Sequence, residues 1–479
     1  MINRKFGKDL TLVVLSNGVR LFSSILTVFF IPMIFPQQDY GFYKLFLLYI
    51  SYVGIFHFGF IDGIYLHFAG KDFSELDKKD FRLYTKALFT VELFVSLIVI
   101  VISLFLTGER QFITFLAGVN LIVLNLTTYF QYISQITQRF KEFATRNIIY
   151  TVMNVILIGS FYLFEITDYR LYIVLTIIIN SVLLLWYVVT YREIVFGKSS
   201  KAIDNIDSLL YILKIGVILL FSNLVVMFFS SIPTQYVDFK YPVEVYPNIF
   251  ANFSFAYTLL GFTGVFMSAI SLVLYPSLNK SRSEEVIKSY NGLVAFVLGS
   301  ISMLIIAYFP MTYIVQVYLP DYYDSLEIFY VLAPGITLTS AVTVVIHNYY
   351  KTLKMNKEFF IIGLVNLLLL IAGIYLVNTF ISQKIIYISI TTVAVQFIWY
   401  LILNHQMNKK FGNRSYKNLL YIIFSSVTFY FTAAIENLLL GFLIYGFIII
   451  TITLLIYFIE IKNIVNLILT KMKNRKTQV

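Results

Sequence analysis

The sequence predicts an all-α polytopic membrane protein with about fourteen transmembrane helices, and its composition and hydropathy predict this fold class together. Of the 479 residues, 59% are hydrophobic and only 13% are charged, whereas charged residues make up about a quarter of an average soluble protein. The mean hydropathy is +0.82. Apolar windows of about 20 residues, long enough to cross the hydrocarbon of a bilayer as helices, recur along the whole chain.

The apolar windows divide the chain into spans whose limits are soft by several residues. The first is expected to be a retained span, because its apolar run ends in PQQDYG without a small-residue cleavage site. The windows run over Leu10–Phe35, Phe42–Leu66, Tyr84–Thr107, Phe112–Thr137, Asn147–Ile166, Leu171–Tyr191, Leu213–Ile232, Ile249–Tyr275, Gly292–Phe309, Leu326–Tyr350, Phe359–Ile381, Ile385–His405, Leu419–Ile435 and Leu438–Glu460.

The basic residues predict the orientation of these spans. Short cytoplasmic loops of membrane proteins carry an excess of Lys and Arg. With the N-terminus placed inside, 30 of the 36 basic residues fall in cytoplasmic segments and one, Arg20, falls within a span. The remaining five fall outside, namely Lys44, Arg110, Arg170, Lys240 and Lys384. This asymmetry predicts that both the N- and C-termini are cytoplasmic.

The net charge of the chain is explained by the same loops. The formal charge is +11, and each basic residue near an anionic inner leaflet contributes about 1 kcal/mol of attraction. Membrane lipids are therefore expected partners, and nucleic acid is not. Residues 461–479 form a basic cytoplasmic tail that ends in KMKNRKTQV after an apolar stripe at helical spacing. We expect this tail to lie on the membrane surface as a helix; a partner-binding tail is the alternative.

The sequence contains no pattern that predicts enzymatic chemistry. There is no cysteine, and the four histidines, His57, His67, His347 and His405, lack the spacing that holds zinc. A phosphate-binding glycine loop with its lysine is missing, and the longest outward loops, of about sixteen residues, are too short for a folded domain. We expect no enzyme, no metal site and no cofactor, and coupling to a proton or sodium gradient stays open.

A short sequence repeat indicates internal duplication. Lys141-Glu142-Phe143 follows the fourth span, and Lys357-Glu358-Phe359 follows the tenth, six helices later on the same side of the membrane. Transporters commonly contain repeated helix bundles with the substrate between them. The repeat predicts six-helix lobes over residues 1–200 and 201–410, followed by two additional helices over 411–460. The alternative, that two basic loops merely look alike, stays open.

Several segments, in their order and spacing relative to the spans, resemble the Wzx-type polysaccharide flippases, a branch of the multidrug/oligosaccharidyl-lipid/polysaccharide exporter superfamily. The segments are PQQDYGFYKL, FGFIDGIYLHFAGK, QRFKEFATRN, YLPDYYDSLEIFYVLAPG and NYYKTLKMNKEF. The resemblance implies two six-helix lobes around a central cavity, plus two extra C-terminal helices.

The resemblance also implies an activity. Its members translocate undecaprenyl-pyrophosphate-linked oligosaccharide repeat units from the inner to the outer leaflet of the bacterial cytoplasmic (inner) membrane, for surface polysaccharides such as O-antigen or capsule. Polysaccharide polymerase and chain-length machinery are the further partners it implies. The chain departs from the family at one place: many relatives carry an acidic-basic pair where span seven reaches the outside, whereas this chain has Ile232 and Pro233 there.

Charged residues inside the spans are the candidate substrate ligands. Arg20 lies about 15 Å deep in span one, while His57 and Asp62 lie about 14 Å and 6 Å deep in span two. An arginine at mid-bilayer costs at least about 2.5 kcal/mol and needs a partner or a watered cavity. We expect Arg20 and Asp62 to converge on one cavity, with Arg20 binding the diphosphate and His57 assisting. The alternative is that Asp62 is a helix-end residue at the membrane interface.

Two further positions and one glycine pair complete the candidate site. Glu92 in span three is predicted to be either a structural carboxylate or an ion-coupling one, and Asp62 is a second candidate for ion coupling. Asn17 is a candidate substrate ligand among the many intramembrane amides, most of which are expected to bond between helices. Gly59 and Gly63 have the GxxxG spacing that lets a neighbouring helix approach closely.

Three other functions compete with a flippase. A cation-coupled small-molecule antiporter of the multidrug type would share the lobes. A polysaccharide polymerase would be a membrane enzyme, but its usual form needs larger outward loops. A non-transporting scaffold would not need a midplane arginine.

Overall fold

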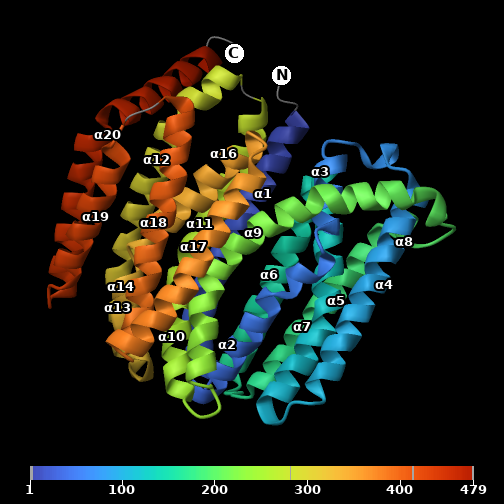
Figure 1. Ribbon diagram of the computed structural model, residues 1–479, viewed down its shortest axis with the longest axis horizontal. Helices are drawn as coiled ribbons and strands as arrows, with labels where there is room; N and C mark the ends of the chain where they lie inside the picture. The colour runs from blue at the N-terminus through green and yellow to red at the C-terminus, as the bar shows by residue number, and fades with distance from the viewer. Residues whose placement is uncertain (1–3, 281, 413–414, 477–479) are drawn as a thin grey trace. The chain divides into compact units, whose positions relative to one another are not determined.

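The structure, a computed structural model, describes residues 4–280, 282–412 and 415–476 (Figure 1). Every regular element in these ranges is helical. The chain divides into two compact units, Met1–Thr258 and Leu259–Val479, called here the N-terminal and C-terminal units. The all-α polytopic fold class is therefore confirmed.

The N-terminal unit is built from ten α-helices and three short 3-10 helices. In chain order they are α1 (Arg4–Ile34), α2 (Gln37–Ser51), η1 (Val53–His57), α3 (Phe60–Phe68), η2 (Phe73–Glu75), α4 (Lys78–Ser103), α5 (Gly108–Ile136), α6 (Phe140–Leu163), α7 (Tyr169–Thr190), α8 (Arg192–Val195), η3 (Ile203–Asn205), α9 (Ile206–Lys240) and α10 (Pro247–Leu260), whose last two residues belong to the C-terminal unit.

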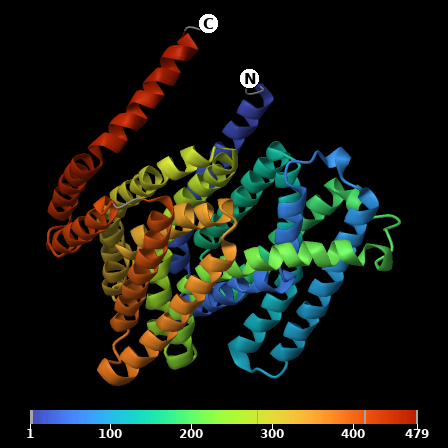
Figure 2. The same cartoon turned by 45° about the horizontal axis from the view of Figure 1, so that its top comes forward.

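The C-terminal unit continues with helices of the same kind. They are α11 (Phe262–Lys280), α12 (Ser283–Leu304), η4 (Ile305–Ala307), α13 (Tyr308–Tyr318), η5 (Pro320–Tyr322), α14 (Ser325–Leu332), α15 (Gly335–Ser340), the π-helical η6 (Ala341–Ile346), α16 (His347–Thr352), α17 (Asn356–Leu376), the π-helical η7 (Val377–Ile381), α18 (Ile386–Phe411), α19 (Lys417–Ala433) and α20 (Leu438–Lys476). The C-terminal part of α20 turns away from α19 after a kink at Tyr457 (Figure 2).

The number of spans depends on how bent helices are counted. In the described residues, nine helices are long and apolar enough to cross a membrane, and two bent pairs raise the number to eleven. The remaining three predicted windows coincide with α1, with α10 and α11, and with α19. Of these, α1 is apolar over Gly18–Ile34, and the side chains of residues 4–15 and 17 lie outside the described part of the chain. Helix α19 has only 17 residues, and the eighth window is divided between two helices. Each predicted window thus contains helix.

The core of the N-terminal unit lies where α3, α4, α5, α7 and α9 meet. Helix α4 lies along α5, and α5 also packs against α7. Phe130, Tyr187 and Tyr191 stack with nearly parallel rings, 4° to 11° apart. The Arg146 guanidinium lies 4.3 Å from the Tyr187 ring centre, and its Nη2 donates a hydrogen bond to Thr190 (2.6 Å). This cation-π contact fixes the start of α6 to the end of α7.

Helices α3 and α9 approach each other through glycine, as the GxxxG spacing predicted. A Cβ added at Gly216 would lie 1.9 Å from the Gly59 carbonyl oxygen, and one added at Gly63 would lie 2.0 Å from the Ile212 carbonyl oxygen. No side chain fits at either position without moving a backbone. The helix that packs closely against Gly59 and Gly63 is therefore α9.

Gly216→Ala should lower the stability of the folded protein by about 3 kcal/mol, because overpacking a rigid backbone contact forces the two helices apart. Gly159→Ala is the matched control, since a Cβ there meets nothing within 4 Å and alanine favours helix by up to about 1 kcal/mol. Thermal unfolding of the purified variants in detergent measures both. Equal stability of the two variants would contradict the contact.

The two loops that carry the sequence repeat have the same backbone conformation. Gln138 and Lys354 both have positive φ, 55° and 58°, which is uncommon outside glycine. The backbone hydrogen bond from Arg139 to Ser134 (2.8 Å) recurs from Met355 to Tyr350 (2.8 Å). Three more bonds recur at the same residue offset, namely Thr137–Ile133 with Leu353–Tyr349, Gln138–Gln135 with Lys354–Lys351, and Phe143–Arg139 with Phe359–Met355. The same positive φ and three of the same bonds also end α6, at Glu165, so this helix end is a common one and both explanations of the repeat stay open.

Candidate functional site

The candidate residues of span two lie at a break in that span. Helix α2 ends at Ser51, η1 follows, and α3 begins at Phe60, with a 60° bend between the two apolar parts. Phe58 and Gly59 have positive φ values of 50° and 81°, which interrupt the helical hydrogen bonds. Asp62 therefore lies in the first turn of α3, where the partial positive charge of a helix N-terminus stabilises a carboxylate.

The break brings His57 and Asp62 together. The Nδ1 atom of His57 accepts a hydrogen bond from the Gly59 backbone N–H (3.1 Å), so Nε2 carries the proton of a neutral imidazole. Nε2 lies 3.8 Å from the Asp62 carboxylate, and the two side chains are only 9% and 7% exposed. The arrangement is a buried proton donor that faces a buried carboxylate.

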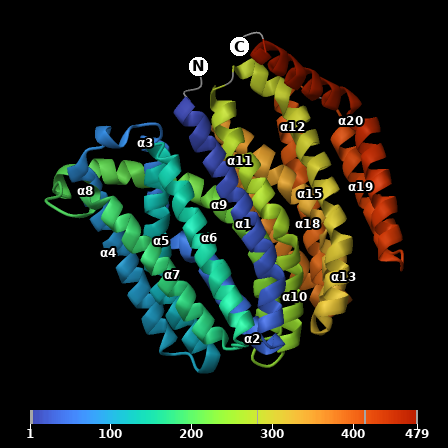
Figure 3. The same ribbon diagram turned by 180° about the vertical axis from the view of Figure 1, so that it is seen from behind.

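Arg20 lies on α1, and Asp62 lies on α3. Helix α1 runs along α6 (Figure 3), whereas α3 packs against α9 and α5. The Arg20 side chain is exposed, and among the residues that the structure describes no ion pair joins it to Asp62. The expected convergence of Arg20 and Asp62 is thus not observed, because similar depth does not make two helices neighbours. The Asn17 side chain lies outside the part of the chain that the structure describes.

Glu92 on α4 is fully buried and bound by an amide. Asn125 of α5 donates from Nδ2 to the Glu92 Oε2 atom (2.8 Å) and to the backbone carbonyl of Val53 (3.0 Å). Because Val53 begins η1, this one amide connects the carboxylate to the break in span two. The other oxygen, Oε1, has no hydrogen-bond partner among the described residues. Protonation would remove the buried charge of Glu92, and a bound cation would give Oε1 a partner.

A charge cluster that sequence reasoning missed connects α5 to the end of α9. Arg110, in the first turn of α5, binds Asp238 through both terminal nitrogens, at 3.0 Å and 2.7 Å. The same guanidinium donates to Glu244 (3.2 Å) and to the Tyr49 hydroxyl (3.0 Å). Asp238 is only 2% exposed. This bidentate, mostly buried ion pair is the strong type of arginine–carboxylate contact.

The sequence carried part of the signal for this cluster. No acidic-basic pair occurs at Ile232 and Pro233, but Asp238 follows within two helical turns on the same helix. Its partner comes from another helix 128 residues away, so adjacency along the chain could not reveal it. The neighbouring residue Glu109 pairs with Arg170 of α7. The first turn of α5 therefore forms ion pairs with both α7 and α9.

Sequence comparisons with known proteins find no relative. No protein-family model matches the chain, and no curated protein matches it.

Comparison of structures does find similar folds. The inward-facing conformation of a multidrug resistance MATE family transporter of the MOP superfamily matches with a TM-score of 0.62 and 12% identity, over 83% of this chain and 98% of that one. The lipid II flippase MurJ in an inward closed conformation matches with a TM-score of 0.57 and 16% identity, over 94% and 100%. A MATE structure in the straight conformation matches with a TM-score of 0.55 and 11% identity, over 84% and 94%. The chain shares the fold of these three solved structures. It spans nearly the full length of each of these neighbours.

Proposed function

We propose that the protein is a flippase that moves undecaprenyl-pyrophosphate-linked oligosaccharides from the inner to the outer leaflet of a bacterial cytoplasmic membrane by alternating access. In this proposal the six-helix lobes comprise residues 1–200 and 201–410, with two additional helices over 411–460 and the cytoplasmic tail over 461–479. Both termini face the cytoplasm. A pyrophosphate and several sugars need such a path, because each unpaired polar group in hydrocarbon costs several kcal/mol.

The exposure of Arg20 is the observation that carries the proposal. Arg20 lies well inside α1, and its side chain is exposed. An arginine there cannot face lipid without a cost of at least about 2.5 kcal/mol, so it faces a watered space. Glu92 and Asp62, by contrast, are buried beside polar partners. The guanidinium fork of Arg20 fits the oxygens of a diphosphate, with Asn17 on the same helix as a further substrate ligand.

Two buried carboxylates support gradient coupling within the same proposal. Glu92 has an unsatisfied oxygen and is connected to the break in span two through Asn125. Asp62 faces the protonated nitrogen of His57. Protonation or cation binding at either carboxylate would change the bonding at the break, which is where span two can alter its bend.

A cation-coupled small-molecule antiporter is the second candidate function. It is favoured by the TM-score of 0.62 to the multidrug transporter, against 0.57 to the lipid flippase. The flippase is favoured by coverage, because it matches 94% of this chain and the multidrug transporter only 83%. Both likenesses concern fold, so transport itself must decide between them.

Transport by the purified, reconstituted protein separates the two candidates. Proteoliposomes receive a fluorescent undecaprenyl-diphosphate oligosaccharide on one leaflet, and an impermeant glycosidase reports how much reaches the other. We expect flipping at least about tenfold faster than in protein-free liposomes, and no movement of ethidium. Ethidium movement without flipping would favour the antiporter, and neither activity would contradict both.

A further inference from the structure

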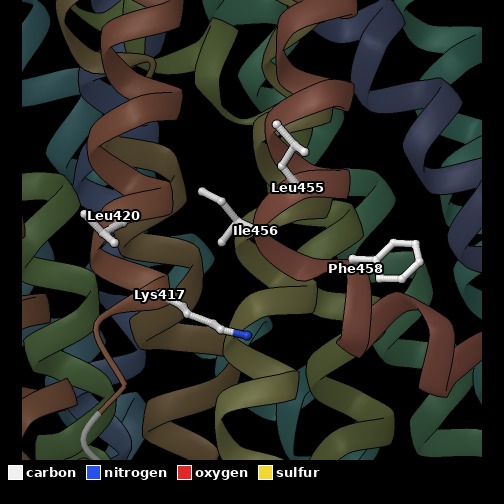
Figure 4. A pocket seen from close by; sticks show the side chains of 5 residues that line it. All are labelled: Lys417, Leu420, Leu455, Ile456 and Phe458. Carbon is white, nitrogen blue, oxygen red and sulfur yellow. The ribbon is translucent and has the colours of Figure 1, made fainter.

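A pocket opens between α19 and α20 at the end of the hairpin away from its connecting turn. It has a volume of about 430 Å³, within the range of roughly 300–1,000 Å³ typical of ligand sites. Figure 4 shows Leu420 on one side, Leu455, Ile456 and Phe458 on the other, and the Lys417 side chain reaching between them. The walls are apolar, and the one charged group lies at the edge.

The pocket lies beside a kink in α20. Tyr457 has non-helical dihedral angles, φ −110° and ψ 20°. Its hydroxyl donates a hydrogen bond to Asn418 of α19 (3.0 Å), and its ring lies 4.7 Å from the ring of Tyr421. The Tyr421 hydroxyl also bonds to Thr453 (2.8 Å). These contacts hold the kink in place, so the space beside it is a fixed feature of the hairpin.

Lys417, at the edge of the pocket, forms an ion pair with Glu460, which lies two residues beyond Phe458 on α20. Lys417 Nζ lies 3.4 Å from the Glu460 Oε1 atom, and the two side chains are 47% and 27% exposed. An exposed pair of this kind contributes little to stability, so either member can turn to another partner at small cost. The Oε2 atom of Glu460 is buried, so Oε1, the oxygen paired with Lys417, is the one that a headgroup can reach.

The position of the pocket along the hairpin matches the boundary between acyl chains and headgroups. Lys417 is the first residue of α19, and the charged residue Glu460 follows two residues after Phe458 on α20. A ligand there would place apolar chain against Leu420 and Leu455, which are 49% and 76% exposed, and its polar end beside the ion pair. Leu455 and Phe458 face outward from the protein, where lipid is the neighbour in a membrane.

We propose that this pocket binds one phospholipid whose headgroup carries a primary ammonium, as phosphatidylethanolamine does. The phosphate accepts a hydrogen bond from Lys417, the ammonium donates to Glu460, and an acyl chain fills the apolar groove. The opposite charges of the headgroup then match the opposite charges at the edge of the pocket.

Charge and hydrogen bonding distinguish this lipid from the common alternatives. Phosphatidylglycerol brings a phosphate but no cation, so Glu460 would stay unsatisfied beside an added negative charge. Phosphatidylcholine brings a cation without an N–H group, so it cannot donate to the carboxylate. A hydrogen bond to a charged group is expected to give a preference of about tenfold or more.

Native mass spectrometry of the full chain tests the proposal. Delipidated protein is incubated with equimolar phosphatidylethanolamine, phosphatidylcholine and phosphatidylglycerol of identical acyl chains. The wild type should retain one phosphatidylethanolamine about tenfold over either other lipid. Glu460→Gln should reduce this preference over phosphatidylcholine to near equality. Lys417→Gln should lower all three adducts together, and Leu420→Trp should abolish them by filling the groove.

Glu358→Gln is the matched control, because Glu358 is an exposed acid at the start of another helix of the same unit. It should keep the wild-type pattern. Size-exclusion profiles check that each variant is folded. If Glu460→Gln misfolds, lipid retention by Lys417→Gln and Leu420→Trp still tests whether this pocket is the binding site. Equal retention of the three lipids, preference for phosphatidylglycerol, or an unchanged preference in folded Glu460→Gln would each overturn the proposal.

Discussion

Arg20→Ala is expected to reduce flipping of the lipid-linked oligosaccharide at least about tenfold while leaving the protein folded. Loss of a charge-assisted hydrogen bond to phosphate costs about 1.5–3 kcal/mol, which corresponds to that factor or more. The Arg20 side chain is exposed, so its removal leaves no cavity. Removal of a mid-span charge should even favour insertion, by about 2.5–3.5 kcal/mol on the translocon scale. The reconstituted flipping assay and thermal unfolding measure the two effects separately.

Arg20→Lys should recover only part of the activity, because an ammonium cannot reproduce the bidentate fork. Lys79→Ala serves as the control, since Lys79 is an exposed basic residue in the first turn of α4, and it should flip substrate at the wild-type rate. Normal flipping by Arg20→Ala would contradict the assigned role. A loss of flipping that merely follows a loss of stability would show a structural role instead.

Arg110→Ala is expected to cost about 3 kcal/mol of stability, the largest loss among the charged residues outside the candidate site. It leaves the buried Asp238 carboxylate, 2% exposed, without its counter-ion, and broken buried pairs typically cost about 3–5 kcal/mol. Arg110 is itself 26% exposed, which places the cost at the lower end. Asp238→Asn should cost less, because Arg110 keeps Glu244. Thermal unfolding in detergent measures the stability lost in Arg110→Ala and in Asp238→Asn.

Arg170→Ala provides the comparison at the same turn of α5. Its pair with Glu109 is formed by an arginine that is 52% exposed, so its loss should cost no more than about 1 kcal/mol. The double variant Arg110→Ala/Asp238→Asn should cost less than the two single changes added, by about 0.5–3 kcal/mol. Equal costs for Arg110→Ala and Arg170→Ala would show that burial of Asp238 does not matter.

Local sequence patterns were sufficient for the membrane fold and for one close contact. Apolar length identifies spans, because a helix must satisfy its own backbone in lipid. The GxxxG spacing of Gly59 and Gly63 predicted a close helix neighbour, because the absence of a Cβ is visible in the sequence itself. The repeat of Lys141 at Lys357 likewise pointed to two loops that share one backbone geometry. Each of these signals lies within a few residues of chain.

Only the tertiary structure decided which polar residues meet. Asp62 faces His57 and not Arg20, since span two breaks at Phe58 and its second part packs against α9. Apolar residues on both sides conceal that break in the sequence. Arg110 finds Asp238 across 128 residues. Hydropathy places a residue along the membrane normal, but the choice of neighbouring helix depends on packing of whole surfaces, and no local pattern in one chain encodes that choice.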